Sequence, residues 1–413
     1  MKQMTTFLFL ILLPLMLMSC GEKDDEKLGP KEIKLTAEQL ELIEGSNSFG
    51  LDLFRKVVSG EDTSENVFIS PLSVHLALSM TWNGAGGNTR EQMMSTLNYP
   101  GFDDETINSS IKKLISDLLS VDEKVETGIA NSIWYRDGYS VEQDFLEINS
   151  KYFNAEVSSL NFDDPASRDI INAWVAGETN NRIKEIIDRI DPDHIMFLIN
   201  AIYFKGIWTT EFVKENTKSR PFYLPGGQAG EVMTMETEGA FGYAERDGYR
   251  VAELPYGRGN YSMLVFLPDE ETGVKGMSEK LSAEEWNLLP ELLDNKYDLN
   301  LRLPRFTFEY DTDLDSSLMS LGMTDAFDGR ADFTGINRNG GLYISRVRHK
   351  SFVEVNEEGT EAAAVTSVEI REVSYNPDEP QIIFFHVNRP FVIAIKEKFT
   401  NSLIFIGRVM DPV

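Results

Sequence analysis

An almost unbroken apolar run in the middle of the chain, IMFLINAIYF at residues 195–204, constrains the fold more than any other feature. The run is rich in β-branched and aromatic residues, which is typical of a strand that is covered on both faces. Further strands are indicated downstream at residues 261–267, at the alternating Leu299, Leu301 and Leu303, and at residues 391–395 and 403–406. We therefore expect the second half of the chain to consist largely of strands.

The first half of the chain carries helix signals instead. A capping box that opens at Thr36 predicts that the fold begins near this residue. Ser70 followed by Pro71 predicts a second helix, and the spacing of apolar residues predicts a third over residues 169–188. Because no repeat or low-complexity tract interrupts this order, the pattern indicates one α+β domain over residues 36–413.

Residues 1–19 have the form of an export signal. Lys2 precedes an apolar run at residues 7–18 that is too short to span a bilayer comfortably. Ser19 before the lone Cys20 resembles the bacterial lipobox, in which Cys20 would be lipidated and become the mature amino terminus. A plain signal peptide with an incidental cysteine is the alternative.

Residues 20–35 are polar and are expected to form an acidic, flexible tether. The charge run at residues 22–26 (EKDDE) resembles the export tag of surface lipoproteins in the Bacteroidota, although an ordinary tether accounts for it equally well. The expected localisation is an exported domain, lipid-anchored at the outer-membrane surface or facing the periplasm. Contact with the membrane would be made only through Cys20.

Composition and motifs argue against catalysis and cofactor binding. The chain has 39 basic and 67 acidic residues, and a net charge of −28 repels phosphate backbones, so nucleic acid is not expected as a partner. One cysteine cannot form an internal disulfide, and the four histidines are scattered without a spacing typical of metal sites. The sequence contains no phosphate loop, nucleophile elbow or metalloprotease motif. We expect neither an enzyme nor a metal or cofactor.

One segment near the carboxyl end has an unusual combination of properties. After Gly359, every second residue from Thr360 to Ile370 is small or apolar, whereas the residues between them are mostly polar. This period is that of a half-buried strand, and its slim leading end could slide between neighbouring strands. Pro377 and Pro380 then indicate an exposed, extended loop. Periodicity alone also fits an ordinary edge strand followed by a turn.

Motifs throughout residues 36–413 resemble those of the serpins, in the order of that family. They are NVFISPLS at 66–73, NAIYFKGIW at 200–208, LPRF at 303–306, LGMTDAF at 321–327, HK at 349–350, EEGTEAAA at 357–364, RPF at 389–391 and FIGRV at 405–409. The resemblance implies an α+β serpin fold with about nine helices, three β-sheets and an exposed reactive-centre loop at about residues 357–380.

The resemblance also implies a function. Most serpins are irreversible suicide-substrate inhibitors of serine endopeptidases, and some act on cysteine endopeptidases. Cleavage of the loop forms an acyl-enzyme, and the freed loop then inserts as an extra strand in the main sheet. The alternative is a non-inhibitory serpin that acts as a cell-surface binding module, which bulky or charged hinge residues would favour. In either case we expect a monomer.

The family pattern gives roles to individual residues of this sequence. The hinge would consist of Glu357, Glu358, Gly359, Thr360, Glu361, Ala362, Ala363 and Ala364. The shutter beneath the main sheet would consist of Ser70, Ser73, Asn200 and His349, for which a satisfied buried polar cluster without a gating role is the alternative. Trp208 would lie at the breach, where insertion begins, unless it is plain core.

The class of protease that the loop would attract depends on the position of the scissile bond. Counting from Gly359 by the usual spacing of the family implies a bond between Val373 and Ser374, which suits elastase-like proteases. The stretch after this bond is longer than in many members, so two alternatives stay open. Arg371 would attract trypsin-like proteases, which rank second, and Tyr375 would attract chymotrypsin-like ones.

Overall fold

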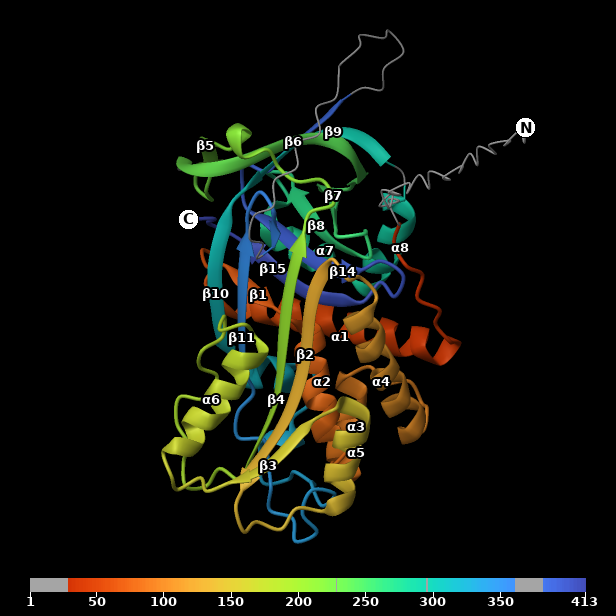
Figure 1. The fold of residues 1–413 in the computed structure, drawn as a ribbon, viewed down its shortest axis with the longest axis vertical. Helices are drawn as coiled ribbons and strands as arrows, with labels where there is room; N and C mark the ends of the chain where they lie inside the picture. Colours follow the sequence, from red (N-terminus) through yellow and green to blue (C-terminus); the bar gives the residue numbers. More distant parts are fainter. Residues whose placement is uncertain (1–28, 228, 295, 361–381) are drawn as a thin grey trace, which may run out of the picture.

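The structure, a computed structural model, describes residues 29–227, 229–294, 296–360 and 382–413 (Figure 1). Within these ranges the α-helices are α1 Ala37–Gly60, α2 Pro71–Trp82, α3 Gly87–Thr96, α4 Asp104–Ser120, α5 Gln143–Phe153, α6 Ala166–Glu178, α7 Gly273–Lys280, α8 Ala283–Leu293 and α9 Asp315–Ser320. The strands are β1 Val67–Ile69, β2 Val125–Arg136, β3 Glu156–Leu160, β4 Met196–Ile207, β5 Lys218–Tyr223, β6 Ala229–Arg246, β7 Tyr249–Tyr256, β8 Tyr261–Pro268, β9 Lys296–Pro304, β10 Phe306–Asp313, β11 Arg348–Val355, β12 Gly359–Thr360, β13 Ile383–His386, β14 Phe391–Glu397 and β15 Leu403–Val409.

The predicted starts of the first two helices are confirmed. The Thr36 hydroxyl accepts a hydrogen bond from the Gln39 amide, and the Gln39 side chain accepts one from the Thr36 amide, so the capping box precedes α1. Ser70 caps α2 by accepting a hydrogen bond from the Ser73 amide at 3.2 Å, with Pro71 in the first turn.

The third predicted helix, over residues 169–188, was placed too far along the chain. The helix α6 spans Ala166–Glu178 and ends before Asn180 and Asn181, which both adopt left-handed backbone angles (φ 47° and 62°). Its continuation was predicted because Ile183, Ile186 and Ile187 preserve the helical period. They pack against the same small core as α6, but from an irregular segment.

Two hydrogen-bonded sheets organise the described residues. The six-stranded sheet has the order β10-β11-β12-β4-β2-β3, and the nine-stranded sheet has the order β1-β15-β14-β8-β7-β6-β9-β13 with β5 also paired to β6. The long strand β6 pairs with β5 and β9 along most of its length and with β7 only from Gly242 onward. The larger sheet thus contains two groups of strands joined through β6, so the described residues form two hydrogen-bonded sheets where three were expected.

The predicted strands are confirmed as β4, β8, β9, β14 and β15, and each extends one to three residues beyond its predicted end. The strand β4 starts one residue later, and β9 three residues earlier, than predicted. No residue of β4 before Ile207 is exposed, as expected for a strand covered on both faces. The strand β2 was missed, because its sequence VETGIANSIWYR is too polar to show an apolar run.

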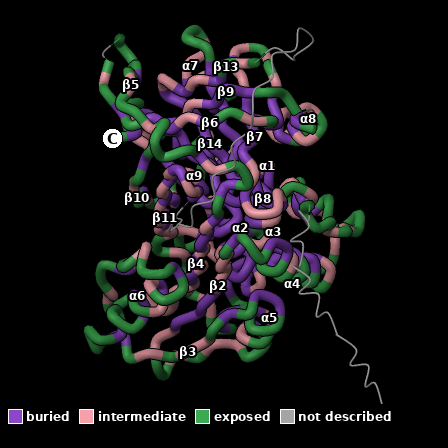
Figure 2. The backbone as a smooth tube through the Cα atoms, turned by 45° about the horizontal axis from the view of Figure 1, so that its top comes forward, coloured by how far each residue is buried: buried purple, intermediate pink, exposed green. Residues whose placement is uncertain are grey.

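The helix α2 lies between the two sheets and packs against both β4 and β15. Figure 2 shows that buried residues concentrate here and in the central strands of the larger sheet. The amino end of α2 therefore reaches the underside of the six-stranded sheet. Among the described residues, no helix is both long and apolar enough to cross a membrane.

Candidate functional site

The predicted hinge enters the six-stranded sheet at Gly359. Gly359 pairs with Ile207 of β4 and Thr360 with Gly206, while Thr360 also pairs with Val355 of β11, both in antiparallel fashion. The two-residue strand β12 is therefore wedged between β4 and β11, the long strands that lie side by side in Figure 1.

Glycine is required at position 359 because the backbones approach closely. A Cβ atom there would lie 2.0 Å from the carbonyl oxygen of Gly206 and 2.8 Å from Cα of Ile207. Because both contacts are to backbone atoms of the central strand β4, no side-chain movement could relieve them. Gly359 thus sets how closely β12 can approach β4.

Thr360 points into the protein interior. Its side chain is buried, and Oγ1 lies 2.6 Å from the phenolic oxygen of Tyr256 at the end of β7. The Tyr256 ring in turn stacks on Trp208, with ring centroids 4.3 Å apart. Burial raises the pKa of Tyr256 above its usual value, so the phenol is neutral at all physiological pH values.

Trp208 holds the turn that leads into β12. The indole Nε1 donates to the carbonyl oxygen of Asn356 at 2.9 Å, and the backbone amide donates to that of Glu358 at 2.8 Å. The Asn356 side chain closes the turn by accepting hydrogen bonds from the amides of Glu358 (3.0 Å) and Gly359 (3.2 Å). The predicted breach residue therefore contacts the start of the predicted hinge directly.

The two hinge glutamates are also paired. The Glu357 carboxylate is buried and accepts a hydrogen bond from the Thr217 hydroxyl at 2.7 Å, with Arg305 at 3.6 Å. Glu358 forms an ion pair with Lys214. These contacts fix the chain up to Thr360.

Below β12 the sheet is open. In the described residues β4 and β11 do not pair with each other, and a cavity of about 730 Å³ lies between and beneath them. We call this space between β4 and β11 the slot. Its walls include Ile199 and Ala201 of β4 and Ser351 and Val353 of β11, and its floor includes Val74 of α2.

The four predicted shutter residues meet at the floor of the slot. The amide of Ser70 donates to Nε2 of His349 on β11 at 3.1 Å, and the Ser70 hydroxyl donates to the carbonyl oxygen of Ile404 at 2.7 Å. The Ser73 hydroxyl donates to the carbonyl oxygen of Asn200 on β4 at 3.4 Å. The first turn of α2 thus links the two strands that border the slot.

The polar side chains of this cluster are uncharged at neutral pH. Burial lowers the pKa of His349 to about 4, so its imidazole accepts the Ser70 amide as a neutral base. The Asn200 side chain donates to Oδ1 of Asn131 at 2.8 Å. Its own Oδ1 is buried and has no hydrogen-bond partner among the described residues.

Several predicted site residues lie outside the described residues. They are the hinge residues Glu361, Ala362, Ala363 and Ala364, the loop residues Arg371, Val373, Ser374 and Tyr375, and the lipidation residue Cys20. Their roles stay predictions.

Tyr256 was missed in the sequence. It ends an ordinary strand, YRVAELPY, and no local motif marks it, so only the fold shows that it meets Thr360. A second group, Asp191, Asp193 and His194, brings three potential ligand atoms within 4.8 Å of one another. Nδ1 of His194 accepts the Asp191 amide at 3.1 Å, so this nitrogen is not free to bind a metal ion.

Comparison with known proteins agrees with this architecture. The family model for serpins (serine protease inhibitor) matches residues 44–412. Human serpin B4 is 34% identical over 394 residues, covering 90% of this chain and 99% of its own. The leukocyte elastase inhibitor of Sus scrofa is 35% identical over 386 residues, covering 90% of this chain and 100% of its own. The crystal structure of the thermophilic serpin tengpin in its native state superposes with a TM-score of 0.81 at 34% identity, covering 92% of this chain and 96% of that one. The chain therefore belongs to the serpin family.

Proposed function

We propose that this serpin is an irreversible suicide-substrate inhibitor of serine endopeptidases, with cysteine endopeptidases as a second class, and that it works by inserting its cleaved loop into the slot. The observation that carries the proposal is the position of β12. Its two residues already occupy the entrance between β4 and β11. Thr360 is the last described residue before the loop, and it points inward.

The register of β12 supports insertion of the segment that follows it. If the pairing with β4 continued, Ile370 would lie opposite Met196, the first residue of β4. The segment that alternates in sequence would thus pair with β4 from Gly206 back to its first residue. Because Thr360 faces inward, the small or apolar side chains at every second position would also face inward, and the polar ones would face solvent.

The same register supports a role for the shutter cluster. Thr366 would lie opposite Asn200 on one side and opposite His349 on the other. Its hydroxyl could then donate to Oδ1 of Asn200, the buried acceptor that has no partner among the described residues of the uncut chain. This hydrogen bond would satisfy the acceptor in the inserted state, and a hydrogen bond contributes about 0.5–1.5 kcal/mol net.

The target class is proposed from the loop sequence. Val373 before the scissile bond suits elastase-like proteases, and a leukocyte elastase inhibitor among the relatives supports that order. Trypsin-like proteases rank second, through Arg371. Mass spectrometry of the released carboxyl-terminal peptide, after treatment with elastase or trypsin, identifies the bond. Dominant cleavage outside residues 369–376 would overturn the ranking.

The mechanism is tested at the slot entrance. Thr360→Arg places a charge on the inward face, so insertion should be slower than hydrolysis of the acyl-enzyme and the protein should become a substrate. Ala363→Arg is the matched control, because the same side chain would replace another small residue on the outward face. In SDS gels with elastase, the control should form a stable complex and Thr360→Arg should be cleaved without one.

A stable complex with Thr360→Arg would refute insertion. Failure of the unaltered protein to form a complex with any protease of a broad panel would favour the non-inhibitory binding module instead.

We further propose that the domain is exported and anchored through a lipid on Cys20, at the outer-membrane surface or facing the periplasm, and that it is a monomer. The lipobox-like Ser19-Cys20 and the polar residues 20–35 support the anchor. Labelling of cells with a radioactive fatty acid should mark the protein but not Cys20→Ser. Equal labelling of the two would refute the anchor.

A further inference from the structure

The segment between α6 and β4 passes over the slot. We call residues 180–194 the strap. Its residues Ile183, Ile186 and Ile187 line the cavity and pack against the small core formed with α6. On the opposite side of the slot, the cavity is lined by the residues that lead into β11. The strap is therefore placed to contact both walls.

The backbone of the strap is fixed by α6. Oδ1 of Asn172 accepts hydrogen bonds from the amides of Ile186 and Ile187, each at 2.9 Å, and its Nδ2 donates to the carbonyl oxygen of Ile187 at 2.8 Å. Asn172 is buried in the middle of the helix. The next residue, Asp188, is thereby held at a defined position over the slot.

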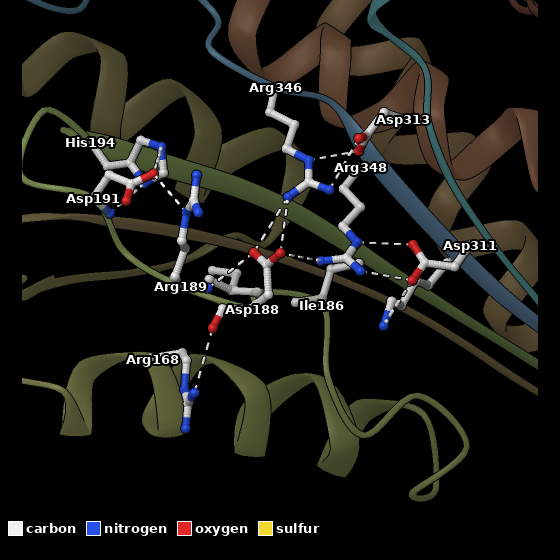
Figure 3. A network of polar contacts seen from close by, with 12 residues as sticks. Arg168, Ile186, Asp188, Arg189, Asp191, His194, Asp311, Asp313, Arg346 and Arg348 are labelled. Carbon is white, nitrogen blue, oxygen red and sulfur yellow. Dashed lines mark hydrogen bonds and ion pairs between the residues drawn. The ribbon is translucent and has the colours of Figure 1, made fainter.

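The carboxylate of Asp188 reaches across to the β11 side (Figure 3). One oxygen lies 3.4 Å from Nη1 of Arg346, and the other lies 3.4 Å from Nη1 of Arg348. The same two arginines are held from behind by Asp313, at 2.6 Å from Nε of Arg346, and by Asp311, at 2.8 Å from Nη2 of Arg348. Asp188 thus joins the strap to the pair of strands β10 and β11.

The carboxylate of Asp188 is ionised at neutral pH and therefore attracts both arginines. Partial burial alone would raise the pKa of Asp188, but a backbone hydrogen bond and the charges of Arg346 and Arg348 outweigh it and hold the pKa below its usual value. Nη1 of Arg348 is buried and has no hydrogen-bond partner among the described residues, so Asp188 is the charge that faces it. Further along the strap, Arg182 lies over the Phe352 ring and 3.5 Å from Glu354.

These contacts lie where an added strand would pass. Continuing the register of β12, a strand that filled the slot would run between Phe197 and Arg346 and between Ile199 and Arg348. Neighbouring strands lie about 4.8 Å apart, so a strand between β4 and β11 holds them at twice that distance. Because the strap is held by α6, which contacts β4, and both arginines lie on the β11 side, the ion pairs of Asp188 span the path of that strand.

We propose that Asp188 is a positioning residue of the inhibitory reaction, whose ion pairs with Arg346 and Arg348 hold the strap across the slot and slow the entry of a strand. This inference rests on the proposed function. A slow entry in the uncut protein keeps the slot available until a protease has cut the loop.

The test uses a synthetic peptide with the sequence of residues 360–373, TEAAAVTSVEIREV, added to the uncut full chain. Its annealing into the slot is followed as a new band in native gels and as a rise in melting temperature. At low salt, Asp188→Asn should anneal about two- to tenfold faster than the unaltered chain, because two partly exposed ion pairs are lost. Asp188→Glu should restore a rate within about twofold of the unaltered chain.

Asp117→Asn is the matched control, because it removes the same charge from an ion pair with Lys113 inside α4. It should anneal at the rate of the unaltered chain. The ratio of the Asp188→Asn rate to the Asp117→Asn rate should fall towards one at high salt, where charges are screened. A merely structural role for Asp188 would not give this salt dependence.

Equal annealing rates for Asp188→Asn and Asp117→Asn at low salt would overturn the role of Asp188. They would not affect the proposal that the slot accepts a strand. Failure of the peptide to anneal to any variant would overturn the slot itself, and the proposed function with it.

Discussion

The phenolic oxygen of Tyr256 lies 2.6 Å from Oγ1 of Thr360, and both side chains are buried. The contact joins the end of β7 in the nine-stranded sheet to β12 in the six-stranded sheet. The buried hinge residue Thr360 is therefore held by a partner from outside its own sheet, and that partner stacks on Trp208.

Tyr256→Phe should loosen the hinge. The substitution keeps the ring stack but leaves the Thr360 hydroxyl without its partner, which costs about 1–3 kcal/mol. The amides of Gly359 and Thr360 should exchange hydrogen about tenfold faster, as measured by mass spectrometry of a peptide that contains them. Tyr261→Phe is the control, because Tyr261 donates to the carbonyl oxygen of Leu118 instead. Unchanged exchange in Tyr256→Phe would show that the contact does not hold the hinge.

Gly359→Ala should prevent the pairing of β12 with β4. The added Cβ would meet the Gly206 carbonyl oxygen at 2.0 Å, whereas a Cβ at Gly128 in β2 would meet nothing closer than 3.5 Å. We expect the yield of SDS-stable complex with elastase to fall at least about tenfold in Gly359→Ala, with the loop still cleaved. Gly128→Ala should keep the yield of the unaltered chain. Full inhibition by Gly359→Ala would mean that close approach to β4 is not needed.

Stability should fall as the pH drops from about 6.5 towards 4. Burial lowers the pKa of both His349 and His75 to about 4, below the ordinary 6.5. Between these pH values the unfolded chain therefore binds more protons than the folded one, and acidification stabilises the unfolded state. Each histidine should cost about 2 kcal/mol of unfolding free energy between pH 7 and pH 5. His349→Gln, which keeps an acceptor for the Ser70 amide, should remove about half of the loss in urea titrations. If His349→Gln lost as much unfolding free energy between pH 7 and pH 5 as the unaltered chain, His349 would not be buried in its neutral form.

Much of the fold could be predicted because its signals are local. The cap at Thr36, the Ser70-Pro71 helix start and the apolar run that became β4 each depend on neighbouring residues in the sequence. The α6 boundary could not be predicted in this way. Two consecutive asparagines in left-handed conformation ended the helix, although the isoleucines beyond it kept the helical period.

The residues of the candidate site likewise fall into those that a local sequence pattern could identify and those that only the fold brings together. The family motifs led to Trp208 and to three of the four residues that meet beneath the slot, because these residues lie in matching stretches of eight or nine residues. His349 was found from the short pair HK, by its place in the order of the family motifs. Tyr256 and Asp188 lie in sequence that carries no motif, and each matters through a contact with a residue more than a hundred positions away. Such contacts follow from topology, and the sequence pattern does not contain them.

The central claim is that the uncut chain has not reached its most stable topology, since the slot between β4 and β11 stands open below β12. Its most direct test is the melting temperature of the purified chain before and after a single cut in the loop, followed by circular dichroism. Because the freed strand would add hydrogen bonds along both β4 and β11, the cut chain should melt at least about 10 °C higher than the uncut one. A cut chain that melts at the same temperature or lower would contradict the account.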